Sequence, residues 1–426
     1  MGHSSTSGAS TPPLDARAVV VSRTPTLRSD RDRQVPVSDR LAPLYSMGRP
    51  DPQHWRPFRA PHSATTTTAA TTTTTATSTA ASNFASAATA TSTASAASAA
   101  TSAAAANASA PPHCDRIYRW LVDIDAWHVE VGDTEWKYLL KRCVSEDEAT
   151  KVMKFMQAPD KKRALISRLL QRRACHEAFG IACADVTIER TKGGKPFLSN
   201  KPRPAPAARN WNFNVSHEGR FVALASEPYA VCGIDVAAPS VTRDRKPKPM
   251  SEQLRYMDKQ FTPAELAVIT GAHPDEKAME AYFRRFWSLK EAYTKGRGDG
   301  LGFEFSRCEF TLGDFSVGTA GQPVQLATVC VDGQPLPHWR FYIQELDGGH
   351  WISVSRGPAS DIVDAHGKFK ASLEEMGDSK EARAALQAEL QRPEPPFVLK
   401  AVAELVPTEL REDYARVVAS AKQSRH

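Results

Sequence analysis

The sequence predicts an α+β (α/β) body made of two successive lobes, preceded by a disordered N-terminal region. Three observations support this prediction. Residues 63–112 contain no Asp, Glu, Lys or Arg and consist almost entirely of Ala, Thr and Ser, so they have too little apolar surface to fold. From Arg116 to Pro358, strand-like alternation and helix-like periodicity follow each other in two groups. After Ala359 the chain becomes a charged helical tail, interrupted at "RPEPP".

These limits divide the chain into four parts. We assign residues 1–112 to the disordered low-complexity region, 113–232 to an N-terminal lobe, 233–358 to a C-terminal lobe and 359–426 to the charged helical tail.

The N-terminal lobe contains two candidate strands, a helix and a hairpin. "YRWLVDIDAW" and "VTIER" are typical of strands. Between them, "DKKRALISRLLQRRACHEAFG" predicts a helix, because Leu165, Leu169 and Ala174 form one apolar stripe and Gly180 suits a helix C-terminus. "WNFNVSHEGRFVALAS" has two alternating runs around a His-Glu-Gly turn and predicts a hairpin.

The C-terminal lobe begins with a strand, "YAVCGIDVA", and continues with a long helix around Trp287. "FEFSRCEFTL", "HWRFYIQEL" and "HWISVSR" supply further strands. Between the first strand and the helix lies a basic loop, residues 238–253, in which Pro247 and Pro249 preclude a regular helix or central strand. Its basic residues are Arg243, Arg245, Lys246 and Lys248. They fit either a solvated mobile loop or a docking surface for an acidic partner.

Composition narrows the class of protein. The net charge of +6 suits an acidic partner or a phosphate ligand better than nucleic-acid coating, so we expect no nucleic-acid partner. Seven scattered cysteines without a CxxC pair indicate reduced thiols. No apolar run is long enough to cross a bilayer. We expect a soluble cytoplasmic (cytosolic) protein, while "MGHSST" leaves N-myristoylation open and the Arg/Ser-rich opening leaves mitochondrial targeting open.

A carboxylate interrupts the first strand of the C-terminal lobe. Asp235 lies between Ile234 and Val236, and an acid in an apolar run must be paired, capped or bound to a cation. Taken alone, Asp235 is better explained by an ordinary ion pair or strand-end turn than by a metal site.

The long helix carries two faces. Its core stripe comprises Met279, Phe283, Phe286 and Tyr293. Trp287, Glu291 and Lys295 repeat at i, i+4 and i+8 and share a second face. The helix then enters "GRGDGLGFEF", whose four glycines suit close backbone approach to a ligand or to another segment. This combination favours a metal and phosphate site over a surface Glu–Lys pair.

A basic glycine turn supplies further phosphate-binding capacity. "IERTKGGKPF" places Arg190, Lys192 and Lys195 around two glycines, but it lacks the spacing of a P-loop. A solvated basic turn and a phosphate-binding turn are equally compatible with it.

In this order along the chain, "TKGGKPFL", "FNVSHEGRFVALA", "GIDV" and "FWSLKEAYTKGRGDGLGF" resemble the blocks of 4′-phosphopantetheinyl transferases of the larger, pseudo-dimeric class. The resemblance covers roughly Glu146 to Arg356. It implies two similar α/β lobes forming an intramolecular pseudo-dimer, with coenzyme A in the cleft between them. It also implies transfer of the phosphopantetheine arm of coenzyme A, with Mg²⁺, to a serine of an acyl or peptidyl carrier protein, as in a holo-[acyl-carrier-protein] synthase.

The resemblance also implies a metal site. Asp235 and Glu291 match the family's metal carboxylates, and divalent magnesium prefers oxygen ligands. The family often has a further glutamate two residues after the aspartate, where this chain has Ala237. Glu218 could supply the missing ligand.

Other residues match catalytic and coenzyme A positions. Glu291 resembles the general base, and Lys295 resembles the group that stabilises charge on the leaving phosphate. His217 resembles a ligand of the 3′-phosphate. The remaining matches to coenzyme A-binding positions are Lys151, Arg190, Lys195, Pro196, Asn214 and Ser216.

Two alternatives remain: a non-catalytic carrier-binding scaffold and another metal-dependent nucleotide phosphotransferase. The missing P-loop disfavours the second, and the intact Asp235, Glu291 and Lys295 disfavour the first. We expect a monomer without a membrane partner, because two lobes in one chain already form the cleft.

Overall fold

The computed structural model describes residues 116–202, 208–243, 246–373 and 380–423. The expectations for the low-complexity region and for Gly2 therefore lie outside the described residues. No helix within the described ranges is long and apolar enough to span a membrane. Each cysteine placed by the structure has a free thiol, as expected, and all but Cys330 are buried.

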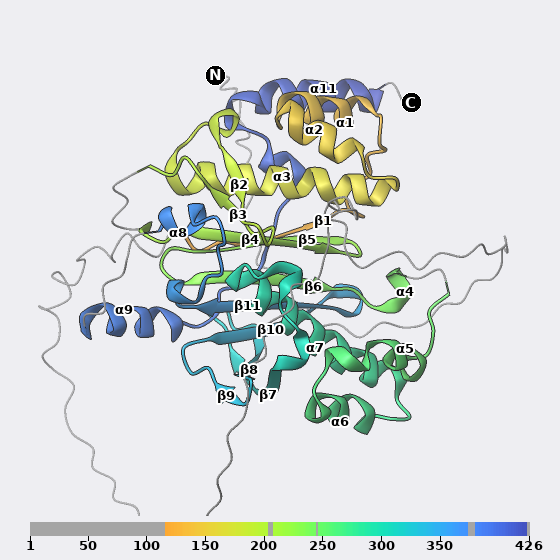
Figure 1. Cartoon of the computed structure of the whole chain (residues 1–426). Coiled ribbons are helices and arrows are strands. Elements are labelled where there is room, and N and C mark those ends of the chain that lie inside the picture. The colour runs from red at the N-terminus through yellow and green to blue at the C-terminus, as the bar shows by residue number, and fades with distance from the viewer. Residues whose placement is uncertain (1–115, 203–207, 244–245, 374–379, 424–426) are drawn as a thin grey trace, which may run out of the picture. The chain divides into compact units, whose positions relative to one another are not determined.

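The N-terminal lobe is built on a four-stranded sheet with the strand order β12-β1-β5-β4. Helix α3 lies along one face of this sheet, and α1, α2 and α11 lie beyond α3 (Figure 1). The bounds are β1 Arg119–Asp123, α1 Thr134–Arg142, α2 Glu146–Met153, α3 Ala158–Phe179, β4 Asn212–Glu218, β5 Phe221–Glu227, β12 Val398–Leu399 and α11 Arg411–Gln423. Two short strands, β2 Ile188–Arg190 and β3 Pro196–Leu198, pair separately.

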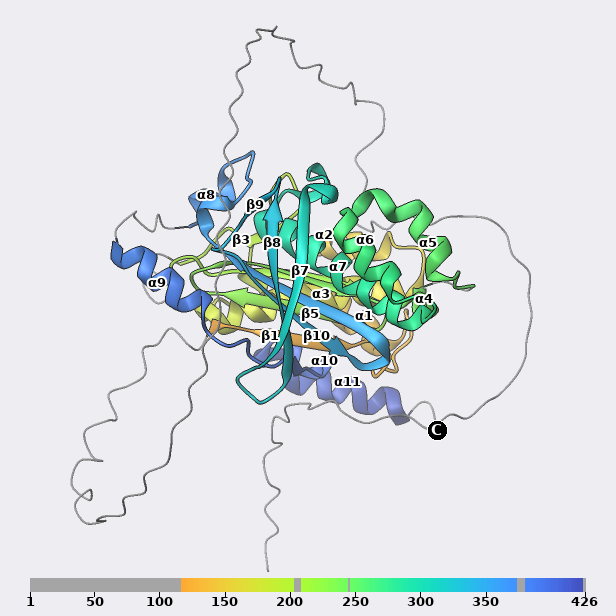
Figure 2. The same cartoon turned by 90° about the horizontal axis from the view of Figure 1, so that it is seen from below.

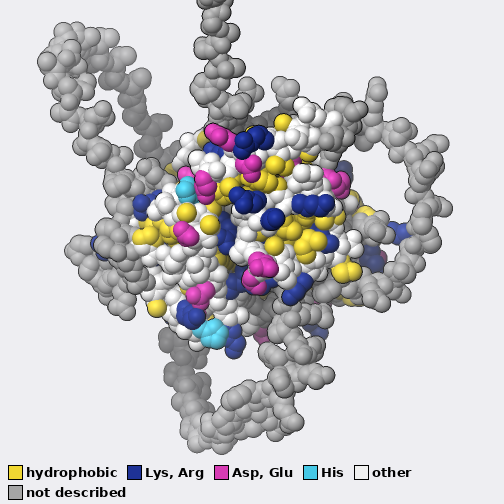
Figure 3. All heavy atoms as spheres, turned by 90° about the horizontal axis from the view of Figure 1, so that it is seen from above, with side chains coloured by type: hydrophobic (Ala, Val, Ile, Leu, Met, Phe, Trp, Pro, Cys, Tyr) yellow, Lys and Arg dark blue, Asp and Glu magenta, His cyan; other side chains and the backbone are white. Residues whose placement is uncertain are grey.

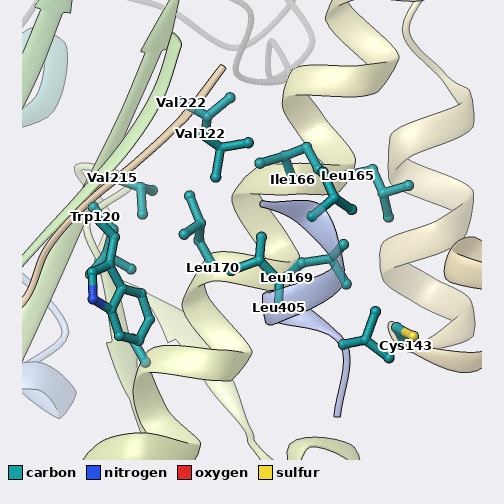
Figure 4. Close-up of a cluster of buried hydrophobic side chains, with 14 of the residues drawn as sticks. Trp120, Val122, Cys143, Leu165, Ile166, Leu169, Leu170, Val215, Val222 and Leu405 are labelled. Carbon is teal, nitrogen blue, oxygen red and sulfur yellow. The ribbon is translucent and has the colours of Figure 1, made fainter. Parts of the chain in front are cut away.

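Helix α3 follows the predicted pattern. Leu165, Leu169 and Ala174 are buried, and the helix ends at Gly180, whose φ of 68° is left-handed. Figure 4 shows Ile166 and Leu170 of α3 on the side of the sheet residues Trp120, Val122, Val215 and Val222, and Leu165 and Leu169 on the side of Cys143. The same cluster includes Leu405 of α10 (Val402–Leu405), so the C-terminal segment contributes to the core of the N-terminal lobe.

The C-terminal lobe is built on a second sheet with the order β6-β11-β10-β8-β7, and β9 pairs with β8. The bounds are β6 Val231–Ala237, β7 Cys308–Val317, β8 Pro323–Val331, β9 Gln334–Pro335, β10 Arg340–Leu346 and β11 His350–Gly357. Its helices are α4 Ser240–Arg243, α5 Met250–Met257, α6 Pro263–Gly271 and α7 Glu276–Arg297. Figure 2 shows α4, α5 and α6 grouped beside α7. The prediction that residues 238–253 contain no helix was wrong, because α4 and the start of α5 lie within this range. Between these two helices, residues 246–249, which include the two prolines, have no regular structure, and Arg245 lies outside the described residues.

Helix α7 is capped at both ends and has the core stripe that the sequence predicts. The Asp275 carboxylate accepts hydrogen bonds from the backbone N–H groups of Lys277 and Ala278. The helix ends at Gly298, which has a φ of 91°. All four residues of its predicted core stripe are buried.

The two lobes pack sheet against sheet. Ala223 and Ala225 of β5 share an apolar cluster with Ile234 of β6 and Val354 of β11, and Phe397 closes this cluster from the C-terminal segment. The structure confirms an α+β fold with two sheet-containing lobes.

The C-terminal segment also carries a buried charge that bridges the lobes. Glu394 contacts Arg119 of β1, and its carboxylate lies 2.6 Å from Nη2 of Arg356 of β11. Glu227 of β5 contacts both arginines as well. All four side chains are at most 2% exposed. We predicted residues 359–426 as a helical tail; they contain α8 Lys368–Ala371, α9 Lys380–Leu390, α10 and α11, but also this bridge and strand β12, which pairs with β1 in parallel.

Candidate active site

The candidate site lies along the free edge of β6, where β4 and the C-terminal half of α7 meet it. Strand β6 pairs with β11 on one side only, so its other edge would expose unpaired backbone N–H groups. The N-terminal lobe covers that edge with polar side chains.

These polar side chains come from alternate residues of β4, so they point to the same side of the strand. Asn212 and Asn214 accept hydrogen bonds at 3.0 Å through Oδ1 from the backbone N–H groups of Cys232 and Ile234. Two further members continue the series. Ser216 Oγ accepts from the Val236 N–H at 3.2 Å, and Glu218 Oε2 accepts from the Ala238 N–H at 2.6 Å. We call these four residues of β4 the polar ladder.

Helix α7 lies directly on β6 because a glycine leaves room for it. A Cβ atom on Gly233 would lie 1.9 Å from the Ala292 carbonyl oxygen, and one on Gly296 would lie 2.8 Å from the Ser355 hydroxyl oxygen. Ser355 in turn donates a hydrogen bond to the Ala292 carbonyl at 2.7 Å. This close packing brings the last turns of α7, with Glu291 and Lys295, next to Asp235.

Three predicted residues form the centre of the site. Lys295 Nζ lies 2.5 Å from Asp235 Oδ1 and donates to Ser216 Oγ at 3.0 Å. Ser216 donates its own hydrogen to Asp235 Oδ1 at 2.8 Å. A serine hydroxyl has one donor and two acceptor sites, so the contacts with Asp235, Lys295 and the Val236 N–H use all three. The hydroxyl of Ser216 would have to give up one of them to bind a ligand.

Burial shifts the pKa values of the acids and the lysine. Desolvation raises the pKa of Glu291 to about 7, although Lys295 alone would lower it. Desolvation also raises the pKa of Asp235, again against the effect of Lys295. Desolvation by itself would lower the pKa of Lys295, but Asp235, Glu291 and Glu218 together raise it. A pKa near 7 suits a carboxylate that has to accept a proton at neutral pH.

Cations from α3 surround the other side of the site. Arg163 Nη1 donates to the Gly219 carbonyl of the β4–β5 turn at 2.5 Å. Desolvation, followed by the charges of Arg163, Lys295 and Arg168, lowers the pKa of His217 to about 4. The imidazole of His217 is therefore neutral at pH 7, and the two arginines supply the positive charge that would attract an anion. Elsewhere, the face in Figure 3 mixes basic, acidic and apolar side chains without a continuous basic patch.

The donor atoms fit a hard divalent cation in chemistry and charge. Asp235, Glu291 and Glu218 are carboxylates whose charges act on one another, and a single lysine, Lys295, compensates them at the centre of the site. Among the described residues, no three Asp, Glu, His or Cys side chains are already arranged as a metal-binding group. A metal ion at Asp235 would share this carboxylate with Lys295 and Ser216, which both contact its Oδ1 atom.

The two glycine-rich segments pack against each other. A Cβ on Gly193 would lie 2.0 Å from the Gly298 carbonyl oxygen, and one on Gly300 would lie 2.5 Å from the Gly193 carbonyl oxygen. The sequence left open whether these glycines allow close approach to a ligand or to another segment. The structure shows close approach to another segment. Lys195 belongs to the same joint, because its buried Nζ donates to the carbonyl groups of Cys232 at 2.6 Å and Lys295 at 3.3 Å. Burial lowers the pKa of Lys195 to about 8.

The structure places the remaining predicted coenzyme A residues away from the central contacts. Lys151, on α2, is exposed and pairs with Asp147 at 2.7 Å. Arg190, at the end of β2, donates to the Gly194 carbonyl at 2.9 Å, and Pro196 is buried in β3. Their assignment to coenzyme A stays a prediction.

Trp287 does not belong to the site. Its ring stacks on Phe283 at 6.1 Å and meets Phe305 edge-on at 5.4 Å in the core of the C-terminal lobe. Of the three residues on the second face of α7, only Glu291 and Lys295 lie beside Asp235.

Sequence reasoning missed several residues around the site. Arg163 and Arg168 belong to α3, a helix that we predicted from its apolar stripe, and neither arginine is part of a motif that indicates a site. Asn212, which we also missed, accepts a hydrogen bond from a backbone N–H of β6 in the same way as Asn214 does. Its alternation with Asn214, Ser216 and Glu218 was a signal visible in "NFNVSHE".

Comparisons with known proteins point to one family. Residues 126–229 match the family model of the 4′-phosphopantetheinyl transferase N-terminal domain, and residues 231–355 match that of the 4′-phosphopantetheinyl transferase superfamily. The chain is 32% identical over 238 residues to the mouse (Mus musculus) L-aminoadipate-semialdehyde dehydrogenase-phosphopantetheinyl transferase, covering 56% of this chain and 74% of the relative.

Relatives outside the animals match as well. A phosphopantetheinyl transferase of a Thraustochytrium species is 31% identical over 241 residues, covering 54% of this chain and 78% of the relative. The Bacillus subtilis 4′-phosphopantetheinyl transferase is 29% identical over 171 residues, covering 40% and 67%. The two family models follow each other along the two lobes, and the chain belongs to the 4′-phosphopantetheinyl transferase superfamily.

Proposed function

We propose that this chain transfers the 4′-phosphopantetheine moiety of coenzyme A to a serine hydroxyl of an acyl or peptidyl carrier protein, in a reaction that depends on Mg²⁺. Membership of the superfamily supports this proposal. The observation that carries it is the convergence of Asp235, Glu291 and Lys295 at the edge of β6.

The chemistry is one substitution at phosphorus. The serine oxygen of the carrier forms a bond to the β-phosphorus of coenzyme A, and the bond from that phosphorus to the bridging oxygen breaks. Adenosine 3′,5′-bisphosphate leaves with that oxygen. The serine loses its proton during the attack.

Each central residue has a role in this substitution. Glu291, with a pKa of about 7, accepts the serine proton. Lys295 donates hydrogen bonds to the leaving phosphate, where negative charge develops. Asp235 and Glu291, with Glu218 beside them, would hold Mg²⁺, and this ion neutralises charge on the diphosphate when it is bound.

The cations of the N-terminal lobe would bind the rest of coenzyme A. The charges of Arg163 and Arg168 act on His217, so this group suits a phosphate that is not transferred. A neutral His217 can still donate one hydrogen bond to such a phosphate.

The test is to incubate the purified chain with coenzyme A, Mg²⁺ and an apo carrier protein, and to measure the mass of the carrier. A gain of one phosphopantetheine is the expected result. A carrier that binds without gaining mass would indicate a scaffold, and a different covalent product would indicate another phosphotransferase. Asp235→Ala and Glu291→Ala should each remove most of the activity while the protein remains folded, because each deletes a charged ligand at the edge of the core.

A further inference from the structure

The polar ladder meets Asp235 at a particular place. The backbone N–H groups on either side of Asp235 belong to Ile234 and Val236, and they are bound by Asn214 and Ser216. Strand β11 holds β6 from the other side, with Ser353 opposite Asp235. The position of the Asp235 carboxylate therefore depends on two side chains from the other lobe.

We propose that Asn214 is a positioning residue for Asp235 and not a ligand of coenzyme A. The residue is 3% exposed, and its Oδ1 atom accepts a hydrogen bond from the Ile234 N–H at 3.0 Å. A side chain enclosed between the lobes in this way acts on the reaction through the strand that it holds.

Removing this hydrogen bond has a defined physical consequence. The Ile234 N–H lies in a buried strand, and a buried donor without a partner costs about 1–3 kcal/mol. Strand β6 would shift to find water or another acceptor, and Asp235, the next residue, would move with it. Loss of a residue that orients a metal ligand typically lowers metal affinity or activity by about 10- to 100-fold.

The chain offers a matched control in Asn212. This residue makes the same Oδ1 contact with the Cys232 N–H at 3.0 Å, and its Nδ2 also donates to the carbonyl groups of Asn210 at 2.9 Å and Ala230 at 2.7 Å. Asn212→Ala therefore deletes more hydrogen bonds than Asn214→Ala, but it does so three residues before Asp235. A purely structural effect would be at least as large in Asn212→Ala.

The chain also suggests a conservative variant. A serine at position 216 already accepts a backbone N–H in this ladder. Asn214→Ser could accept from Ile234 in the same way and should restore part of the function. This variant also keeps the test valid if Asn214→Ala fails to fold.

The experiment compares the wild type, Asn214→Ala, Asn214→Ser and Asn212→Ala in the full chain. It measures Mg²⁺ binding by calorimetry without substrates, hydrogen exchange of the 234 amide, the melting temperature, and kcat and KM in the transfer assay. We expect Asn214→Ala to weaken Mg²⁺ binding and lower kcat by about 10-fold or more, with faster exchange at 234 and KM for coenzyme A within about two-fold. Asn214→Ser should be intermediate. Asn212→Ala should lower the melting temperature at least as much but leave Mg²⁺ binding and kcat near wild type.

Two results would overturn the inference. A rise in KM for coenzyme A with unchanged Mg²⁺ binding would show that Asn214 is a substrate ligand. Equal losses of Mg²⁺ binding and kcat in Asn212→Ala and Asn214→Ala would show that the polar ladder has only a structural role. The inference rests on the proposed function for its kinetic part only. If the wild type transfers nothing, the proposed function fails, while Mg²⁺ binding and hydrogen exchange still decide whether Asn214 positions Asp235.

Discussion

Glu291→Gln should stabilise the protein at alkaline pH, although it should abolish activity. The pKa of Glu291 is raised from its ordinary 4.5 to about 7, mainly by desolvation. In the unfolded chain the same carboxyl group ionises near 4.5, so folding opposes its ionisation. The cost to stability is absent below about pH 4.5, grows as the pH rises toward 7, and is complete above 7. Gln has no charge to bury and is spared this cost.

The size of the effect follows from the pKa. Each pKa unit is worth about 1.36 kcal/mol, so a rise from 4.5 to about 7 corresponds to about 3 kcal/mol. Because Glu291 is only half-buried, solvent screening reduces the expected gain to about 2 kcal/mol. The free energy of unfolding of Glu291→Gln should therefore exceed that of the wild type by about 2 kcal/mol near pH 8, and the two should be nearly equal near pH 4.

The assay is urea denaturation of both proteins across this pH range, with and without Mg²⁺. Adding Mg²⁺ should narrow the difference in unfolding free energy between the two proteins near pH 8, because a bound cation favours the ionised carboxylate.

Glu280→Gln on the same helix is a control for which we expect the opposite sign. Ser240 and Arg284 lower the pKa of Glu280 despite its burial, so its contribution is present above about pH 4.5 and its loss destabilises the protein near pH 8. A stability difference for Glu291→Gln that does not change with pH would refute the reasoning.

Three other predictions test the frame around the site. Glu394→Ala leaves Arg119 and Arg356 buried without one of their partners and should cost about 3–5 kcal/mol in urea denaturation, and a cost below 1 kcal/mol would show that the bridge is dispensable. Gly233→Ala should prevent folding or activity, because its Cβ would lie 1.9 Å from the Ala292 carbonyl oxygen. Gly271→Ala, whose Cβ would have no atom within 4 Å, is the control, and a Gly233→Ala variant that matches it in both circular dichroism and transfer activity would contradict this prediction. If the basic loop docks the carrier, Lys248→Glu should raise KM for the carrier and leave KM for coenzyme A unchanged. An equal rise in the two KM values would contradict this role of the loop.

Much of the fold was predictable because it depends on local patterns. The stripe of α3, its end at Gly180, the β4–β5 hairpin and the core face of α7 each follow from residue spacing within one element. We did not predict β8, and β12 could not be found from spacing, because a two-residue strand has no periodicity of its own and exists through its pairing with β1. Trp287 shared the spacing of Glu291 and Lys295, yet the neighbouring Phe283 and Phe305 place it in the core.

The candidate site divides in the same way. The sequence by itself determined which acids and bases are present and, through the order of its motifs, the family to which they point. Only the tertiary structure decided which of them meet: Asp235, Ser216 and Lys295 come from three separate elements and contact one another because β6 has a free edge and Gly233 admits α7. It also decided that Lys195 donates hydrogen bonds to backbone carbonyl groups and that Asn214 accepts one from a backbone N–H. Buried polar groups must find partners, and those partners lie on segments that are distant in sequence.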